Sequence, residues 1–323
     1  MTASDHSSGL PPAPRHILVA TRAHAEIVAA LRARRPDLAF RGALHTDVTP
    51  DDLAWADAYV GFKRPPGAAS LGSVRWVHCT GAGVDDWLSP PPLDPALLIT
   101  RTPESFGPAI AEWVVARIFA IQQQLAALAE EQRAHRWTPR NLPPVAGTRA
   151  LIVGTGDIGS AVAARLAALG VEVTGVSRSG RGEHPAFRAV HPVLALASLV
   201  EAHDWIILTL PDTPGTRGLL SRAVLDRCRG AVLLNAGRGS VVDEAALPDA
   251  LDRGRLRAVA LDVFAVEPLP PTSPLWNDPR VMISPHCSGP TSVEGAANGF
   301  LECLGELEQG RAPRWVVDRE RGY

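Results

Sequence analysis

Three residues able to transfer a proton or bind a carboxylate lie in the second half of the chain, each shortly after a short apolar run. In chain order they are Arg238 after 231–234, Glu267 after 258–261 and His286 after 281–283. Such runs predict buried parallel strands, whose carboxyl ends share the sheet edge where open α/β folds bind ligands. We therefore expect the three side chains to lie close together.

These residue types suit acid–base chemistry on a carboxylate-bearing substrate. Arg238 stands between two glycines, so we expect a flexible and uncrowded backbone, and its planar guanidinium matches a carboxylate. A neighbouring glutamate favours a protonated histidine, which makes His286 with Glu267 a candidate proton donor. Taken singly, Arg238 also fits a surface turn, Glu267 a solvated loop acid and His286 a strand-end histidine. Their convergence at one edge favours the catalytic interpretation.

A glycine-rich loop lies upstream of these residues. Gly154, Gly156 and Gly159 have the G-x-G-x-x-G spacing, between an apolar strand at 150–153 and a helical stretch at 160–169. In a dinucleotide-binding loop the first glycine permits a tight turn, the second lets a pyrophosphate approach, and the third lets helix and strand pack. An ordinary strand-to-helix turn is the alternative. The flanking strand and helix favour dinucleotide binding.

The end of the next strand, 171–176, predicts which dinucleotide is bound. NAD-binding proteins usually carry an acidic residue there, but this chain has Ser177, followed by Arg178, Ser179 and Arg181. Arginines and hydroxyls suit a 2′-phosphate, so we expect NADP(H) to be preferred, with NAD(H) possible. The alternative is a solvated turn in an arginine-rich chain.

The first hundred residues predict a second α/β unit without a phosphate fingerprint. Expected strands and helices, here and in the rest of the chain, are strands 16–20, 58–62, 75–79, 97–100, 205–210, 231–235, 258–261 and 281–284, and helices 24–34, 109–130, 221–227, 243–253 and 291–309. Alternating strands and helices predict parallel, helix-covered sheets. We expect residues 1–102 with 288–323 to form a substrate domain, and 103–287 a dinucleotide-binding domain.

Two features of the first unit are candidate substrate contacts. The loop Gly81-Ala82-Gly83 follows a predicted strand and could present backbone N–H groups to a small anion, although an ordinary turn fits equally well. Lys63, the only lysine, follows another strand and could attract a carboxylate or phosphate, although a solvated surface lysine is the better interpretation.

Composition excludes several classes of protein. With 46% hydrophobic residues, 20% charged residues and a net charge of −2, the chain predicts a globular protein without a nucleic-acid face. Four scattered cysteines predict neither disulfides nor a zinc site, so we expect no metal. No signal peptide or membrane-length apolar run is present, which predicts a cytoplasmic location.

Longer motifs resemble the D-isomer-specific 2-hydroxyacid dehydrogenase family. They are VGTGDIG at 153–159, LPDTPGTRG at 210–218, LLNAGRGSVVDEAAL at 233–247, LDVFAVEPLP at 261–270 and SPLWNDPRVMISPH at 273–286. The segment PPTSPLWNDPRV and the Ser-Arg pair at 177–178 are most similar to glyoxylate/hydroxypyruvate reductases. The match is weaker over the first hundred residues, where mainly TGAGVD fits.

This resemblance implies roles for individual residues. Arg238 would bind the substrate carboxylate and carbonyl, His286 would be the acid/base, Glu267 would orient it, and the loop from Gly81 to Val84 would receive the carboxylate. Further cofactor contacts are expected at Asp157, Ile158, Leu210, Pro211, Thr216, Ala236 and Asp262. The resemblance also implies two Rossmann-like domains, the substrate domain flavodoxin-like, and a homodimer formed mainly by dinucleotide domains.

The resulting prediction is NAD(P)H-dependent reduction of a small 2-keto acid to the D-2-hydroxy acid. Two alternatives remain. One is a nucleotide-sensing, corepressor-like dimer in which turnover does not matter, and the other is a family dehydrogenase acting on a bulkier 2-keto acid.

Overall fold

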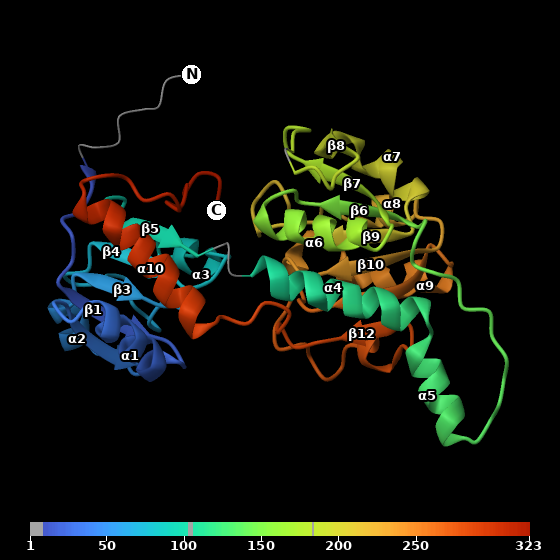
Figure 1. The fold of residues 1–323 in the computed structure, drawn as a ribbon, viewed down its shortest axis with the longest axis horizontal. Coiled ribbons are helices and arrows are strands. Elements are labelled where there is room, and N and C mark those ends of the chain that lie inside the picture. The colour runs from blue at the N-terminus through green and yellow to red at the C-terminus, as the bar shows by residue number, and fades with distance from the viewer. Residues whose placement is uncertain (1–8, 103–105, 183) are drawn as a thin grey trace. The chain divides into compact units, whose positions relative to one another are not determined.

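The computed structural model describes residues 9–102, 106–182 and 184–323. These residues form two compact units, one of residues up to 102 together with 291–323, the other of 106–290 (Figure 1). Each unit contains one parallel sheet with helices, the α/β architecture that the sequence predicts. In the described part of the chain no helix is long and apolar enough to cross a membrane.

The first unit is built on a five-stranded sheet in the order β2-β1-β3-β4-β5. Its elements are β1 (His16–Ala20), α1 (His24–Arg34), β2 (Ala39–Ala43), α2 (Pro50–Trp55), β3 (Ala58–Val60), β4 (Trp76–Cys79), α3 (Asp85–Leu88), β5 (Leu98–Arg101) and α10 (Val293–Glu308). This strand order is flavodoxin-like, as predicted.

Helices cover both faces of this sheet, because successive strand residues point to opposite sides. Ile17 and Val19 of β1 pack with α1 and with Phe300 of α10. Leu18 and Ala20 pack in a second core with residues of α2 and α3. The last helix therefore returns to the first unit, as the sequence predicted.

The second unit has a seven-stranded sheet in the order β12-β11-β10-β9-β6-β7-β8. Its strands are β6 (Arg149–Val153), β7 (Glu172–Ser177), β8 (Ala189–Pro192), β9 (Trp205–Leu208), β10 (Ala231–Asn235), β11 (Leu256–Leu261) and β12 (Val281–Ile283). Its α-helices are α4 (Gly107–Gln122), α5 (Leu125–Arg133), α6 (Asp157–Ala168), α7 (Leu196–Leu199), α8 (Arg222–Leu225) and α9 (Leu247–Asp252). All pairings are parallel, and the chain order reverses beside β6. This is the dinucleotide-binding arrangement with one added strand.

The sequence missed two short edge strands, β2 and β8. Each lies at the end of its sheet order, where only one neighbour supplies backbone hydrogen bonds. Neither is a continuous apolar run, and most of their residues are exposed or half-buried. Apolar patterning therefore gives little signal for them.

The predicted single helix over 109–130 is wrong, because the chain breaks into α4 and α5. Gln124 has a left-handed backbone (φ 50°), and the buried face of α4 ends at Gln122, whose side chain donates to the carbonyls of Pro143 and Pro144. No residue of α5 is buried. Helix α5 and the segment after it extend away from the rest of the second unit (Figure 1).

Two predicted helices of the second unit also differ in the structure. Helix α6 begins at Asp157 rather than Ser160, because Gly156 is already its N-cap. The predicted helix at 243–253 is a 3₁₀ turn at Glu244–Ala246 followed by α9, with Pro248 in the first turn.

Candidate functional site

The predicted site residues of the second unit lie along the carboxyl edge of its sheet. Sheet order places the histidine loop after β12 beside the glutamate loop after β11, then the arginine loop after β10 and the loop after β9. The glycine loop after β6 and the arginine-bearing turn after β7 follow. The edge therefore runs from the proposed acid–base groups at one end to the proposed ribose contacts at the other.

The glycine loop has the geometry that its spacing predicts. Gly154 has a φ of 108°, which side-chain-bearing residues rarely adopt. A Cβ on Gly159 would overlap the carbonyl of Gly154, so this glycine lets α6 start against the loop. A Cβ on Gly156 would meet no atom within 4 Å, so there is open space at the helix N-terminus. Asp157 and Ile158 form the exposed and half-exposed first turn of α6. An open, positive helix N-terminus fits a pyrophosphate.

The loop from Leu210 to Thr216 lies beside the glycine loop. The hydroxyl of Thr209 donates to the carbonyl of Gly154 (3.0 Å), and Leu210 also approaches Gly154. The hydroxyl of Thr216 donates to the carbonyl of Pro211 (2.7 Å) and accepts from the N–H of Thr213 (2.9 Å). Thr216 thus shapes this loop, and cofactor contact by Leu210, Pro211 and Thr216 stays a prediction.

The glycines that flank Arg238 do not give the flexible backbone expected from sequence. A Cβ on Gly237 would come within 2.7 Å of the carbonyl oxygen of Leu210, and a Cβ on Gly239 would overlap the backbone of Phe264. These glycines let the Arg238 loop pack tightly between its two neighbours. Glycine is needed on both sides of Arg238 because a side chain there would collide with the backbone of a neighbouring loop.

Asn235 fixes the same loop from the end of β10. Its side-chain amide donates to the carbonyl of Arg238 (3.0 Å), and its side-chain oxygen accepts from the N–H of Gly237 (3.0 Å). Ala236, which follows Asn235 and was predicted to contact the cofactor, is buried. Sequence reasoning missed Asn235, although a polar residue ending the fully buried strand AVLLN was a usable signal.

His286 and Glu267 form the pair that the sequence predicted. Nδ1 of His286 lies 2.8 Å from Oε2 of Glu267, and Oε1 of Glu267 accepts from the N–H of Phe264 (3.0 Å). Burial opposes ionisation of Glu267, but the bonds from His286 and Phe264 and the positive charge of Arg238 hold its pKa below the usual range. Glu267 is therefore a carboxylate that orients the imidazole and leaves Nε2 as the nitrogen facing away from it.

Asp262 holds the loop that carries His286. Its buried carboxylate accepts from the Ser284 hydroxyl (2.5 Å) and from the N–H groups of Cys287 (3.0 Å) and Ser288 (2.8 Å). Burial raises the pKa of Asp262, but these bonds outweigh it and the net shift is downward. His286 itself has a φ of 51°, so these bonds hold an unfavourable backbone in place. Contact between Asp262 and a nicotinamide stays a prediction.

Ser284 connects this loop to α4. Its hydroxyl oxygen accepts from the indole N–H of Trp113 (3.0 Å) while its hydrogen goes to Asp262. Sequence reasoning missed both Ser284 and Trp113. Nothing in the local pattern could have paired two residues 171 positions apart.

The turn after β7 is closed by Ser177. Its hydroxyl donates to the carbonyl of Arg181 (2.9 Å) and accepts from the N–H of Arg181 (3.0 Å), around Gly180 with a φ of 71°. Arg178 and Arg181 are exposed. The hydroxyl of Ser177 therefore shapes the turn, where the sequence suggested a direct donor to phosphate. Glu183, the next carboxylate in the sequence, lies outside the described residues.

The predicted substrate residues belong to the first unit. Gly81 is buried with Phe62 against it, and Ala82 and Gly83 are half-exposed. Nζ of Lys63 lies 3.9 Å from a carboxylate oxygen of Asp86 and 5.5 Å from the ring centre of Phe62. Substrate binding by Lys63 and by the loop from Gly81 to Val84 stays a prediction.

A family model matches much of the second unit. Residues 115–288 match the NAD binding domain of D-isomer specific 2-hydroxyacid dehydrogenases. The chain belongs to the D-isomer specific 2-hydroxyacid dehydrogenase family. The match covers the glycine loop and the Arg238, Glu267 and His286 loops, so the family resemblance expected from sequence is confirmed.

Relatives extend the match beyond this domain. The chain is 31% identical to glyoxylate/hydroxypyruvate reductase A of Serratia proteamaculans, over 92% of this chain and 96% of that protein. It is 36% identical to an uncharacterized protein in the mprR 3′ region of Streptomyces coelicolor, over 77% of this chain and 90% of that protein.

Solved structures of the family share the whole fold. A D-isomer specific 2-hydroxyacid dehydrogenase from Xanthobacter autotrophicus Py2, in complex with NADPH and MES, gives a TM-score of 0.87 at 31% identity, covering 96% of this chain and 100% of that one. An NADPH-dependent glyoxylate/hydroxypyruvate reductase from Sinorhizobium meliloti, in complex with NADP and sulfate, gives 0.86 at 29% identity, covering 95% and 99%.

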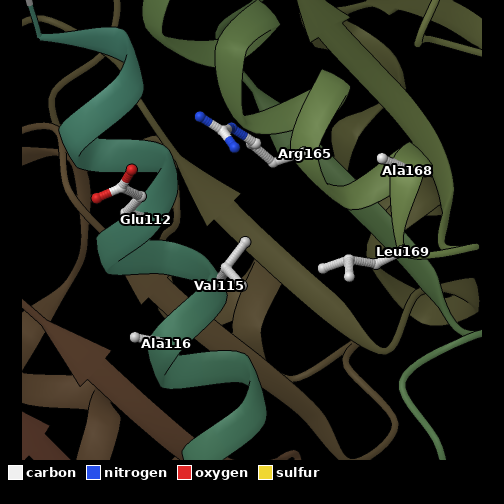
Figure 2. Close-up of a pocket in the computed structure, with 6 residues that line it drawn as sticks. All are labelled: Glu112, Val115, Ala116, Arg165, Ala168 and Leu169. Carbon is white, nitrogen blue, oxygen red and sulfur yellow. The ribbon is translucent and has the colours of Figure 1, made fainter.

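A pocket of about 350 Å³ lies away from these strand ends, between α4 and α6 (Figure 2). It is lined by Glu112, Val115, Ala116, Arg165, Ala168 and Leu169. Figure 2 shows Glu112, Val115 and Ala116 on α4, Arg165 and Ala168 on α6, and Leu169 just after α6. The lining is mainly aliphatic and carries no nucleophile or proton-transfer pair, so the pocket is not a candidate for the family reaction.

Proposed function

We propose that this protein reduces a small 2-keto acid of the glyoxylate or hydroxypyruvate type to the 2-hydroxy acid, with the D configuration where the product is chiral, using NADPH. The observation that carries the proposal is the 2.8 Å pair of His286 with an ionised Glu267, on strand ends of the sheet that also carries the glycine loop. The relatives named glyoxylate/hydroxypyruvate reductases support the substrate class.

In the proposed reaction, protein groups bind the substrate and supply the proton. The bound dinucleotide would deliver a hydride to the carbonyl carbon. Protonated His286 donates from Nε2 to the developing alkoxide, while Glu267 keeps the ring oriented and balances its charge. Arg238 binds the carboxylate and carbonyl and offsets the growing negative charge on oxygen. In the oxidative direction neutral His286 accepts the hydroxyl proton.

The residues present fit a dinucleotide. The space at Gly156 and the start of α6 suit the pyrophosphate. The turn from Ser177 to Arg181 is preformed, exposes two guanidinium groups, and has no acidic residue in its sequence. A ribose hydroxyl gains no carboxylate acceptor there, whereas a 2′-phosphate gains two cations. This supports the preference for NADPH.

We further propose that two copies associate through the second unit. Helix α5 buries none of its residues, Trp137 is 95% exposed and Leu125 is 52% exposed. Arg140 ties the segment after α5 back to Gln124 and Glu131, which gives the projecting arm a defined shape. Large apolar side chains on such an arm favour burial against a partner. The measurement is the solution mass by light scattering: a dimer is expected, with Trp137→Glu shifting the mass toward the monomer, and a wild-type monomer would contradict the proposal.

The test of function is a substrate panel. NADPH oxidation is followed with glyoxylate, hydroxypyruvate, pyruvate and phenylpyruvate, for the wild type and for His286→Ala. Turnover is expected on glyoxylate and hydroxypyruvate, and His286→Ala should lower kcat by about 10²–10⁴ with nearly unchanged NADPH affinity. Nucleotide binding without turnover on any acid would favour a sensor, and a preference for phenylpyruvate would favour the bulkier substrate class.

A further inference from the structure

Three donors hold the carbonyls of the loop from Gly81 to Val84. The N–H of Thr102 donates to the carbonyl of Gly81 (3.3 Å), and a guanidinium nitrogen of Arg101 donates to the carbonyl of Ala82 (3.1 Å). The thiol of Cys79 donates to the carbonyl of Gly83 (3.4 Å). Three successive carbonyls are therefore held by β4, by β5 and by the residue that follows β5.

Holding these carbonyls fixes the direction of the next three N–H groups. In a trans peptide the C=O of one residue and the N–H of the following residue point in opposite directions. The N–H groups of Ala82, Gly83 and Val84 are accordingly directed away from the three tethers. Across the described ranges of the chain, none of these N–H groups has a hydrogen-bond partner in the protein. Successive N–H groups turned to one side form an anion-binding concavity.

Arg101 is the tether that is both charged and supplied by a side chain. It stands at the last position of β5, paired in register with Cys79 of β4, and is half-buried. The group that donates to the carbonyl of Ala82 is a rigid, planar guanidinium. Its positive charge lies on the carbonyl side of the peptide between Ala82 and Gly83, and the N–H of that peptide faces the other way. A cation there adds to the positive potential of the N–H groups and stabilises a bound anion.

The tether from Thr102 is anchored deep in the sheet. The hydroxyl of Thr102 lies 2.8 Å from Nε2 of His78, which is fully buried in β4. The hydroxyl of Thr100 lies 2.8 Å from Nδ1 of the same ring. The backbone position that donates to Gly81 is thus set by buried polar contacts, whereas the tether to Ala82 depends on Arg101.

We propose that Arg101 is a positioning residue for the substrate carboxylate, which it serves by holding the N–H groups of Ala82, Gly83 and Val84 in line and adding positive potential behind them. This inference rests on the keto-acid reduction proposed above. Arg101 acts on ground-state binding of the carboxylate and is not one of the proposed proton-transfer residues. Its loss should therefore change KM far more than kcat.

The test compares Arg101→Gln and Arg101→Lys with Arg75→Gln. Arg75 is a matched control, because it also donates to backbone carbonyls (Gly72 and Val74), at the opposite end of β4. We expect Arg101→Gln to raise KM for glyoxylate by at least about tenfold with kcat within about threefold, and Arg101→Lys to recover part of the loss. NADPH affinity and the thermal midpoint should match those of Arg75→Gln.

A binding measurement separates this inference from the proposed function. Oxamate, an unreactive 2-keto acid isostere, is titrated into each protein–NADPH complex. Weaker oxamate binding in Arg101→Gln alone supports the inference even when the wild type reduces none of the keto acids, an outcome that would overturn only the proposed function. Unchanged KM and oxamate affinity in a folded Arg101→Gln protein would overturn the inference while leaving the reductase function intact. A loss of thermal stability without a KM change would assign Arg101 to structure alone.

Discussion

His78 should make the first unit sensitive to acid. It is fully buried in β4, beside the stacked rings of Trp76 and Phe300, and both ring nitrogens lie 2.8 Å from threonine hydroxyls. Burial lowers the pKa of His78 to about 3. A histidine in the unfolded chain has a pKa of about 6.5, so between these values the unfolded chain binds a proton that the folded chain does not.

The size of the effect follows from that difference. Stability rises with pH wherever the unfolded state binds more protons, so the contribution of His78 is intact above about pH 6.5 and is lost as pH falls. At pH 5 the solution is about 1.5 pH units below the unfolded-state pKa of about 6.5. Protonation of the unfolded chain there lowers the free energy of unfolding by about 2 kcal/mol relative to neutral pH. His78→Gln keeps hydrogen-bonding groups but cannot be protonated, so it should lack this component.

Chemical denaturation followed by tryptophan fluorescence measures the effect, because Trp76 lies beside the site. The fall in unfolding free energy from pH 8 to pH 5 should be about 2 kcal/mol larger for the wild type than for His78→Gln. His45→Gln, at a partly exposed position of the same unit, is the control and should follow the wild type. An equal fall in wild type and His78→Gln would refute the assignment of a neutral, buried His78.

Three further predictions concern catalysis and cofactor choice. Glu267→Gln should move the pH at which reductive turnover declines to lower values, because the amide cannot pair with an imidazolium; an unmoved profile would show that Glu267 is structural. Arg238→Lys keeps the charge but loses the planar fork, so kcat/KM should fall by at least about tenfold, and values within twofold of wild type would mean that any cation suffices. NADPH should exceed NADH by at least about tenfold in kcat/KM, and Ser177→Asp with Arg178→Ala should reverse this order; equal or better turnover of wild type with NADH would contradict the cofactor assignment.

Tertiary structure changed several interpretations of individual residues. Sequence suggested that the glycines around Arg238 give freedom, but Gly239 is there because the backbone of Phe264 leaves no room for a Cβ. The carboxylate of Asp262 holds the His286 loop, a role that the sequence did not suggest, while its contact with the nicotinamide stays a prediction. Helix α4 ends at Gln122 and the left-handed Gln124 precedes α5, although the sequence is compatible with one continuous helix, because no residue of α5 is buried in a core.

Features of this protein that have local causes could be predicted from its sequence. The strand, glycine loop and helix at Gly154–Gly159 follow from backbone sterics, and the shared edge of Arg238, Glu267 and His286 follows from parallel strands with short connections. Features that depend on residues distant in the chain could be known only from the folded structure. The tethers of the Gly81–Val84 loop from Arg101 and Thr102, and the bond between Trp113 and Ser284, join segments 19 to 171 positions apart. Periodicity and motif spacing predict which face of a strand or helix a residue occupies. They do not predict which distant hydrogen-bond donor contacts that residue in the folded protein.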